Sequence, residues 1–178
     1  MSTLFSQQQI VEQTSQNYRD IWATPEEVYQ AFLNPAALEV WQTPGDMTAK
    51  VHHFDLRVNG GYEMSLRYPA SEPRMKGKTT EQEDRYTARF VELVPSCRIV
   101  EAIRFDTTDP DFAAEMMMEV ACAPIENGTR VTISFKNIPR GIRPVDNEAG
   151  TVSSLAKLAQ YVESRTGTAG NVQGEDKS

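Results

Sequence analysis

The sequence predicts an α+β fold in which a curved antiparallel sheet packs against one long helix near the C-terminus. From Lys50 to Phe135, apolar residues alternate with polar ones over short segments, which is the pattern of strands with one buried face. Turn signals separate these segments, and successive hairpins make a sheet antiparallel. From Asp146 to Glu163 the spacing becomes helical, with one apolar face formed by Leu155, Leu158, Ala159 and Val162.

Before the main run of strands, we expect one strand and two short helices. The strand covers residues 15–22. Thr24 is expected to cap the first helix, with Glu27 as its capping-box partner three residues later. Asn34, followed by a proline, separates this helix from a second one that carries Trp41.

About six more strands follow, joined mostly by tight turns. Asn59-Gly60 and Asn127-Gly128 are hairpin signals, whereas residues 69–78 are expected to form a loop. Within each strand, the apolar residues that share one alternation phase are expected to face the core. They are Tyr62, Met64 and Leu66; Tyr86, Ala88 and Phe90; Ile99, Ile103 and Phe105; Met116, Met118, Val120 and Cys122; and Val131, Ile133 and Phe135.

A lone amphipathic helix after so many strands must lay its apolar face on the sheet, and this arrangement tends to leave a hollow between helix and sheet. The chain of 178 residues fits one domain, which we place at residues 15–165. Residues 1–14 are then an N-terminal extension. Residues 166–178 have almost nothing to bury and are expected to be a disordered tail.

The composition argues against several classes of partner. A formal charge of -7 and a pI near 4.9 disfavour binding to nucleic acid or to an acidic membrane surface. No basic segment followed by an apolar one begins the chain, and no apolar run approaches the ~18 residues of a membrane span. We therefore expect a soluble cytoplasmic protein, and we expect Cys97 and Cys122 to be buried reduced thiols.

Several stretches of the chain resemble a known superfamily. They are Ile21–Phe32, Phe54–Tyr62, Tyr86–Pro95, Asp146–Gly150 and Ser154–Leu158. The order of elements and these stretches resemble the SRPBCC superfamily, which includes START domains, polyketide cyclases and pollen-allergen-like proteins. Within it, the chain resembles the bacterial proteins related to the activator of the heat-shock protein 90 ATPase.

This resemblance implies a helix-grip fold, in which the curved sheet wraps around the C-terminal helix. Members of the superfamily enclose apolar ligands or present the fold to a protein partner, and the fold alone decides neither. In the family, a tryptophan commonly follows the glycine that corresponds to Gly150. Here Thr151 stands in its place, and we expect the smaller side chain to leave one end of the cavity roomier or wetter.

Glu101 is the sharpest candidate for chemistry. It shares the alternation phase of Ile99 and Ile103, so its carboxyl is expected to face the cavity with them. Apolar surroundings raise the pKa of a carboxyl, which suits it to acid–base work near neutral pH. The alternative is that Glu101 lies at the cavity mouth and reaches water or an arginine such as Arg104 or Arg130.

The other polar candidates have weaker signals. His52 and His53 are the only histidines. Neighbouring strand residues point to opposite faces, so one is expected to face the cavity as a polar handle, or else to be a hydrogen-bonded structural residue. No third ligand lies at a convincing spacing, so we predict no metal site and no cofactor. We assign no residue a catalytic role.

Five short segments have both a functional and a structural interpretation. Methionines 116–118 suit a deformable pocket, but ordinary core filling is the better explanation. Glycines 60–61 fit a hairpin turn better than a phosphate site. The acidic run 81–84 is expected to be a solvated sheet edge, and the basic loop 139–144 to be surface decoration. Serines 153–154 have no recognisable triad partners.

From these observations we predict binding of a small hydrophobic molecule in the cavity, with Glu101 or a histidine as polar anchor. The expected lining or supporting residues are Tyr62, Met64, Leu66, Tyr86, Phe90, Glu101, Ile103, Met118, Val131, Ile133, Thr151, Leu155 and Leu158. The alternatives are a co-chaperone-like module that binds a protein partner such as a chaperone, and a cyclase-type or hydrolase-type enzyme. Whether the chain acts as a monomer or a homodimer stays open. An open pocket above ~300 Å³ with converging polar groups favours ligand binding.

Overall fold

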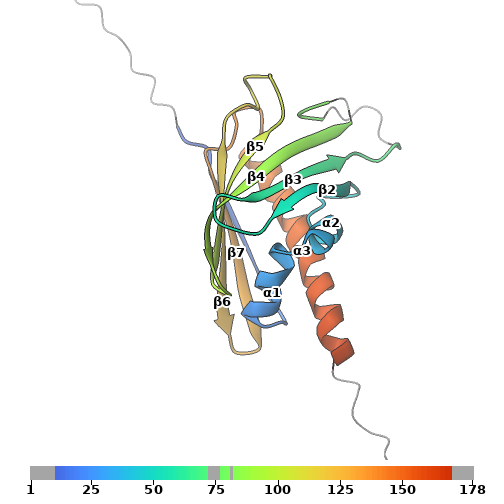
Figure 1. Ribbon diagram of the computed structural model, residues 1–178, viewed down its shortest axis with the longest axis vertical. Coiled ribbons are helices and arrows are strands. Elements are labelled where there is room, and N and C mark those ends of the chain that lie inside the picture. Colours follow the sequence, from blue (N-terminus) through green and yellow to red (C-terminus); the bar gives the residue numbers. More distant parts are fainter. Residues whose placement is uncertain (1–10, 72–76, 81, 170–178) are drawn as a thin grey trace, which may run out of the picture.

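A computed structural model describes residues 11–71, 77–80 and 82–169, and it confirms the α+β helix-grip fold (Figure 1). Its elements in chain order are β1 (Ser15–Ile21), α1 (Pro25–Phe32), α2 (Pro35–Trp41), β2 (Thr48–Asp55), β3 (Gly61–Arg67), β4 (Glu83–Val94), β5 (Arg98–Phe105), β6 (Met116–Ile125), β7 (Gly128–Lys136) and α3 (Pro144–Ala169). The strands form one antiparallel sheet in the order β1-β7-β6-β5-β4-β3-β2. The first two strands of the chain, β1 and β2, are thus the two edges of the sheet.

Local side-chain contacts begin the two short helices where the sequence predicts. The Thr24 hydroxyl accepts a hydrogen bond from the amide of Glu27 at 3.2 Å, and the Glu27 carboxylate accepts one from the amide of Thr24 at 2.8 Å. This is the complete capping box. The side chain of Asn34 caps α2 by accepting hydrogen bonds from two backbone amides of its first turn. The predicted cap at Thr24 is therefore confirmed, and Asn34, which was expected only to separate the two helices, is a cap as well.

Alternation along the strands separates a buried face from an exposed one, as predicted. All the residues assigned to the inner phase of β3 to β7 are buried. Two irregularities interrupt the ladders, one in β2 between Val51 and His53 and one in β4 between Phe90 and Glu92. The β2–β3 connection contains Asn59 in the left-handed region, with a φ of 66°, where asparagine is tolerated.

The long helix α3 lies along the inner side of the curved sheet, and its backbone packs against β1 and α2 (Figure 1). Its predicted apolar face is buried, at Leu155, Leu158, Ala159 and Val162. The helix begins at Pro144 and continues to Ala169, so residues 166–169 are helical, in contrast to the predicted tail. The rest of that tail lies outside the described residues, as do residues 1–10 of the N-terminal extension.

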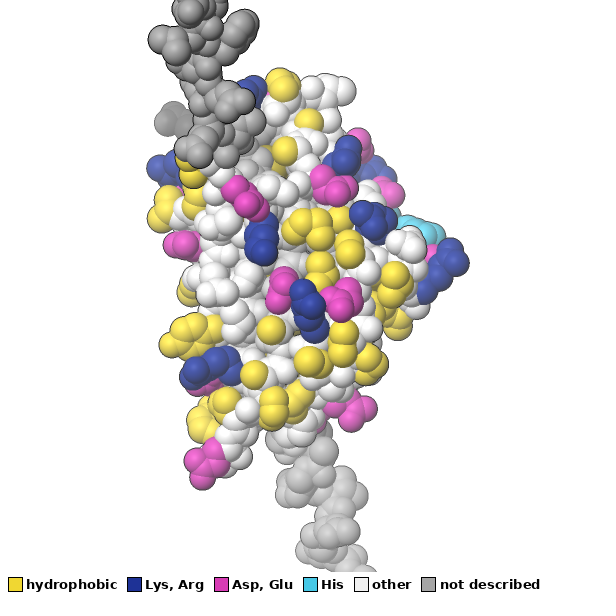
Figure 2. Space-filling view, turned by 90° about the vertical axis from the view of Figure 1, so that its left-hand side faces the viewer, with side chains coloured by type: hydrophobic (Ala, Val, Ile, Leu, Met, Phe, Trp, Pro, Cys, Tyr) yellow, Lys and Arg dark blue, Asp and Glu magenta, His cyan; other side chains and the backbone are white. Residues whose placement is uncertain are grey.

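The outer face of the sheet carries basic and acidic side chains next to each other among scattered apolar ones (Figure 2). Cross-strand ion pairs account for part of this pattern; for example, Arg98 contacts Glu92 and Glu119 at 2.9 Å each. Exposed pairs of this kind contribute only about 0–1 kcal/mol each. Among the described residues, no helix has both the length and the apolar character that a membrane crossing requires.

The two cysteines differ in their surroundings, which corrects one expectation. Cys122 is buried on the inner face of β6, and burial raises the pKa of its thiol to about 12. Cys97 is exposed, because it lies in the turn between β4 and β5 and not within a strand. Both are free thiols.

Candidate functional site

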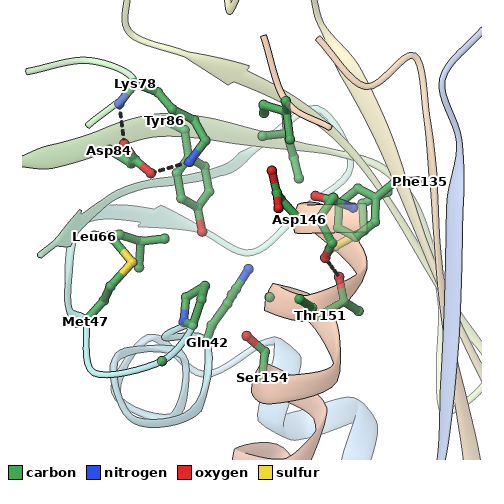
Figure 3. Close-up of a pocket in the computed structure, with 18 of the residues that line it drawn as sticks. Gln42, Met47, Leu66, Lys78, Asp84, Tyr86, Phe135, Asp146, Thr151 and Ser154 are labelled. Carbon is green, nitrogen blue, oxygen red and sulfur yellow. Dashed lines mark hydrogen bonds and ion pairs between the residues drawn. The ribbon is translucent and has the colours of Figure 1, made fainter. Parts of the chain in front are cut away.

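An open cavity of about 810 Å³ lies between the inner face of the sheet, the loop after α2 and the first turns of α3 (Figure 3). Most of its wall is apolar. The apolar wall includes Phe32, Trp41, Leu66, Ile103, Phe105, Met116, Met118, Ile133 and Phe135. Side chains of three elements therefore enclose a space that the packed half of α3 does not fill.

The residues expected at the site divide into two groups. Leu66, Tyr86, Ile103, Met118, Ile133 and Thr151 line the cavity. Tyr62, Met64, Phe90, Glu101, Val131, Leu155 and Leu158 are buried in the core but are not part of the cavity wall. The division follows the course of α3, because Thr151 and Ser154 in its first turns face the cavity, whereas Leu155 and Leu158 pack into the core.

Three polar side chains point into the cavity from different elements. Figure 3 shows Gln42 from the loop after α2, Tyr86 from β4 and Ser154 from α3 directed toward the same space. The Tyr86 hydroxyl donates a hydrogen bond to the sulfur of Met64 at 3.2 Å. Such a set of converging polar groups on an apolar wall is typical of small-molecule sites.

Glu101 lies behind this wall and connects to it through Tyr62. Its side chain is only 1% exposed, and the Tyr62 hydroxyl donates a hydrogen bond to its Oε2 at 2.9 Å. Burial raises the pKa of Glu101 to about 7, and the hydrogen bond from Tyr62 partly opposes that rise. The amide of Gln42 lies 3.4 Å from the Tyr62 hydroxyl. The carboxyl therefore reaches the cavity only through Tyr62 and Gln42, not directly as the alternation phase suggested.

A second polar cluster, at the other side of the cavity, was missed by the sequence reasoning. Asp84 is only 2% exposed, and its carboxylate contacts the ammonium group of Lys78 at 2.5 Å (Figure 3). The Tyr68 hydroxyl donates a hydrogen bond to the same carboxylate at 3.1 Å. Burial raises the pKa of Tyr68 above its ordinary value, as does the nearby Asp84 carboxylate.

The expectation that residues 81–84 form a solvated edge is therefore wrong at Asp84. Its acidic neighbours made the residue look like surface. The signal that identifies it is its alternation phase, because Asp84 shares the phase of Tyr86 and Ala88, which are buried on the inner face. Glu81 lies outside the described residues.

The start of α3 forms the third side of the cavity mouth. The Arg143 guanidinium pairs with the Asp146 carboxylate at 2.7 Å, and both residues line the cavity. The Thr151 hydroxyl donates a hydrogen bond to the carbonyl of Asn147 at 2.7 Å, which is bonding back within the first turns of the helix. In the predicted surface loop 139–144, Arg140 instead pairs with Asp111.

The loop after α2 is attached to α3 by polar contacts. The ammonium group of Lys157 donates hydrogen bonds to the carbonyl of Thr43 at 2.5 Å and to its hydroxyl at 2.9 Å, and it also contacts the carbonyl of Gly45. The amide of Gly45 donates a hydrogen bond to the Ser153 hydroxyl at 3.1 Å. These contacts hold the loop that carries Gln42 over the cavity.

The two histidines lie outside the cavity, which corrects the expectation that one serves as its polar handle. Both are exposed. A ring nitrogen of His52 is 2.8 Å from the hydroxyl of Ser65, so His52 has the hydrogen-bonded structural role that was the alternative. In the part of the chain that the structure describes, no three His, Cys, Asp or Glu side chains gather closely enough to hold a metal ion.

Comparison with known proteins gives a consistent family and fold. Residues 22–163 match the family described as "Activator of Hsp90 ATPase homolog 1-like protein". A crystal structure of a protein from Chromobacterium violaceum is 35% identical, with 84% of this chain and 96% of that chain covered and a TM-score of 0.75. The search of curated proteins gives no match.

Two further solved structures extend the comparison. A protein from Rhizobium loti is 28% identical, with 84% of this chain and 96% of that chain covered and a TM-score of 0.64. An AHSA1-like protein from Aeromonas hydrophila is 18% identical, with 93% and 100% covered and a TM-score of 0.63, which shows the shared fold alone. Because the family model matches residues 22–163 and one relative is 35% identical, the chain belongs to the family of Activator of Hsp90 ATPase homolog 1-like proteins.

Proposed function

We propose that this protein binds a small, mostly apolar molecule in the cavity between the sheet and α3. The observation that carries the proposal is the cavity itself, with its volume of about 810 Å³ and its apolar wall. Small-molecule sites typically have volumes of ~300–1,000 Å³ and an apolar lining with a few placed polar groups. Gln42, Tyr86 and Ser154 are suited to be those polar groups.

The cavity favours this function over a role limited to binding a protein partner. A partner module is expected to have a collapsed core beside an exposed apolar patch. Here the inner face of the sheet is not fully covered by α3, and an open cavity remains. The description of the family names an ATPase activator. That activity requires a contact on the protein surface, which the apolar wall of a cavity does not explain.

The geometry also favours binding over acid–base catalysis. Such catalysis needs a second titratable group beside Glu101 that works near neutral pH. The neighbours of Glu101 are Tyr62 and Tyr86, and burial raises the pKa of both phenols far above neutrality. They are therefore hydrogen-bond donors and not bases. We accordingly propose binding without an assigned reaction.

The proposal is tested by titrating methyl-labelled protein with the uncharged fluorescent dye N-phenyl-1-naphthylamine. Ile103 and Ile133 line the cavity, whereas Ile21 and Ile99 are equally buried but lie outside its wall. We expect the NMR methyl signals of the first pair to shift and those of the second pair to stay in place. Shifts confined to an exposed methyl such as that of Ile125, or no shifts at all, would overturn the proposal.

Native mass spectrometry identifies the natural ligand. Protein purified from its own host under non-denaturing conditions is expected to carry additional mass that disappears on denaturation. The dye should displace this mass if both occupy the same cavity.

A further inference from the structure

Each cationic side chain in the described wall of the cavity already has an acidic partner. Lys78 pairs with Asp84 at 2.5 Å, and Arg143 pairs with Asp146 at 2.7 Å. Asp46 also lines the cavity, and no cation of the described residues lies within ion-pair distance of it. The described wall therefore carries two positive and three negative side chains, and the excess charge is negative.

A bound anion cannot use the ammonium group of Lys78 without a cost in free energy, because this group already pairs with Asp84. An anion that displaces Asp84 from the ammonium group of Lys78 leaves this carboxylate, which is only 2% exposed, without its counter-ion, and an anion that shares the ammonium group lies beside a second negative charge. An uncompensated buried charge is strongly unfavourable. The Tyr68 hydroxyl alone then remains as its side-chain donor.

At the N-terminus of α3, two backbone amides are already used. The amides of Asp146 and Asn147 donate hydrogen bonds to the carbonyl of Arg143, at 3.0 and 3.1 Å. The Asp146 carboxylate already lies in the first turn, where the helix dipole favours a negative group. A ligand carboxylate placed there meets a like charge.

Gln42, in contrast, offers an uncharged donor and an uncharged acceptor at the cavity wall. Its amide lies 3.4 Å from the Tyr62 hydroxyl, which donates a hydrogen bond to Glu101. The Ser154 hydroxyl faces the same space from α3 (Figure 3). Both groups can pair with a hydroxyl, carbonyl or amide of a ligand without desolvating a charge.

We propose that the cavity selects ligands whose polar group is uncharged, such as an alcohol, ketone or amide, and discriminates against carboxylates with the same apolar body. This inference rests on the proposed binding function and specifies its ligand class. Gln42 is the group that recognises the uncharged end, and the two ion pairs exclude the anion.

The test compares dodecanamide with dodecanoate, which share chain length and differ in charge, as competitors of N-phenyl-1-naphthylamine at pH 8. We expect the carboxylate to displace the dye at least about tenfold less effectively, the factor that corresponds to the loss of about one buried polar partner. Equal displacement by the two competitors overturns this inference and leaves the binding function standing. No binding of the dye itself overturns both.

Two variants remove the acidic partners of Lys78 and Arg143 and so test whether the ion pairs cause the discrimination against carboxylates. In Asp84→Asn, Lys78 loses its counter-ion while the amide oxygen still accepts the hydrogen bond from the backbone of Lys78. In Asp146→Asn, Arg143 is freed at an exposed position, so this variant keeps the test valid if the first one unfolds.

We expect either variant to bind dodecanoate more tightly than the parent does, and the ratio of its affinities for dodecanoate and dodecanamide to rise. Asp20→Asn is the matched control, because it frees Arg130 in an ion pair remote from the cavity wall. If neither cavity variant gains affinity for the carboxylate beyond that control, the ion pairs do not exclude anions and the inference fails.

Discussion

The Tyr62 hydroxyl donates a 2.9 Å hydrogen bond to the carboxyl of Glu101 across the intervening strand β4. Both side chains are fully enclosed by the core. Burial makes the charged form of Glu101 unfavourable, and the hydrogen bond from Tyr62 offsets only part of this cost. The pair is thus a polar contact in the core whose state changes near neutral pH.

The first prediction is a pH-dependent stability that arises from Glu101. Its pKa is about 7 in the folded protein and 4.5 in the unfolded chain, so the folded state binds the proton more strongly between these values. Stability should therefore be greatest below about pH 4.5, as far as this group is concerned, and fall until about pH 7. Carboxyl NMR titration measures the midpoint directly.

Glu101→Gln removes this dependence. Relative to the parent, the variant should gain stability as the pH rises from 5 to 8, by up to roughly 3 kcal/mol in urea unfolding. Glu126→Gln, in an exposed turn, should leave the pH profile unchanged. A Glu101 midpoint at or below 4.5 would contradict the buried position of the carboxyl.

The second prediction concerns the effect of the Tyr62 hydroxyl on the pKa of Glu101. Tyr62→Phe removes the donor to the Glu101 carboxylate, so the pKa of Glu101 should rise further. Tyr86→Phe is the matched control, because its hydroxyl donates to Met64 and not to Glu101. The same carboxyl titration distinguishes the two variants. A downward shift in Tyr62→Phe would show that the phenol does not stabilise the charged form.

The third prediction concerns the packed half of α3. Leu158 is fully buried in the core outside the cavity wall, so Leu158→Ala should cost about 2–5 kcal/mol of unfolding free energy. Leu56→Ala, at a half-exposed loop position, should cost far less. Equal midpoints of denaturation for the two variants would be inconsistent with Leu158 packing on the sheet.

The fold could be predicted from the sequence because its signals are local. The alternation that buries Tyr62 and Met64, and the capping box at Thr24, need only a few neighbouring residues to be read. The inward phase of Glu101 could be read from the sequence, but its place behind the cavity wall and its hydrogen-bond partner could not. That partner, Tyr62, lies two strands away, and no local pattern along β5 indicates a contact across β4.

The site was predicted less completely for the same reason. Asp84 was hidden by its acidic neighbours, although its phase with Tyr86 marks it as inward-facing. The expectation that one of the two histidines faces the cavity was wrong, because the irregularity in β2 between Val51 and His53 interrupts the regular alternation on which it relied. The boundary between the packed part of α3 and the cavity depends on the long-range contacts of this helix with β1 and α2. The helical periodicity does not specify these contacts.

The fourth prediction concerns the loop over the cavity. Lys157→Met removes the contacts to Thr43 and Gly45 that hold this loop on α3, while it keeps a side chain of similar length. We expect faster dissociation of N-phenyl-1-naphthylamine in stopped-flow measurements, with a smaller change in its Kd. Lys136→Met, at an exposed position of β7, is the control. Identical dissociation rates for both variants and the parent would mean that the loop does not limit exchange.

The last prediction fills the cavity at Thr151. This residue is buried at the cavity wall in the first half of α3, and its hydroxyl bonds back to the helix, so a larger side chain there projects into the empty space. Thr151→Trp should remain folded and bind N-phenyl-1-naphthylamine at least about tenfold more weakly, a loss of about 1.4 kcal/mol. Val152→Trp is the control, because Val152 is 51% exposed and outside the cavity wall. Unchanged dye binding in Thr151→Trp, together with a stability loss of the ~1–3 kcal/mol that overpacking costs, would show that the cavity does not extend to this residue.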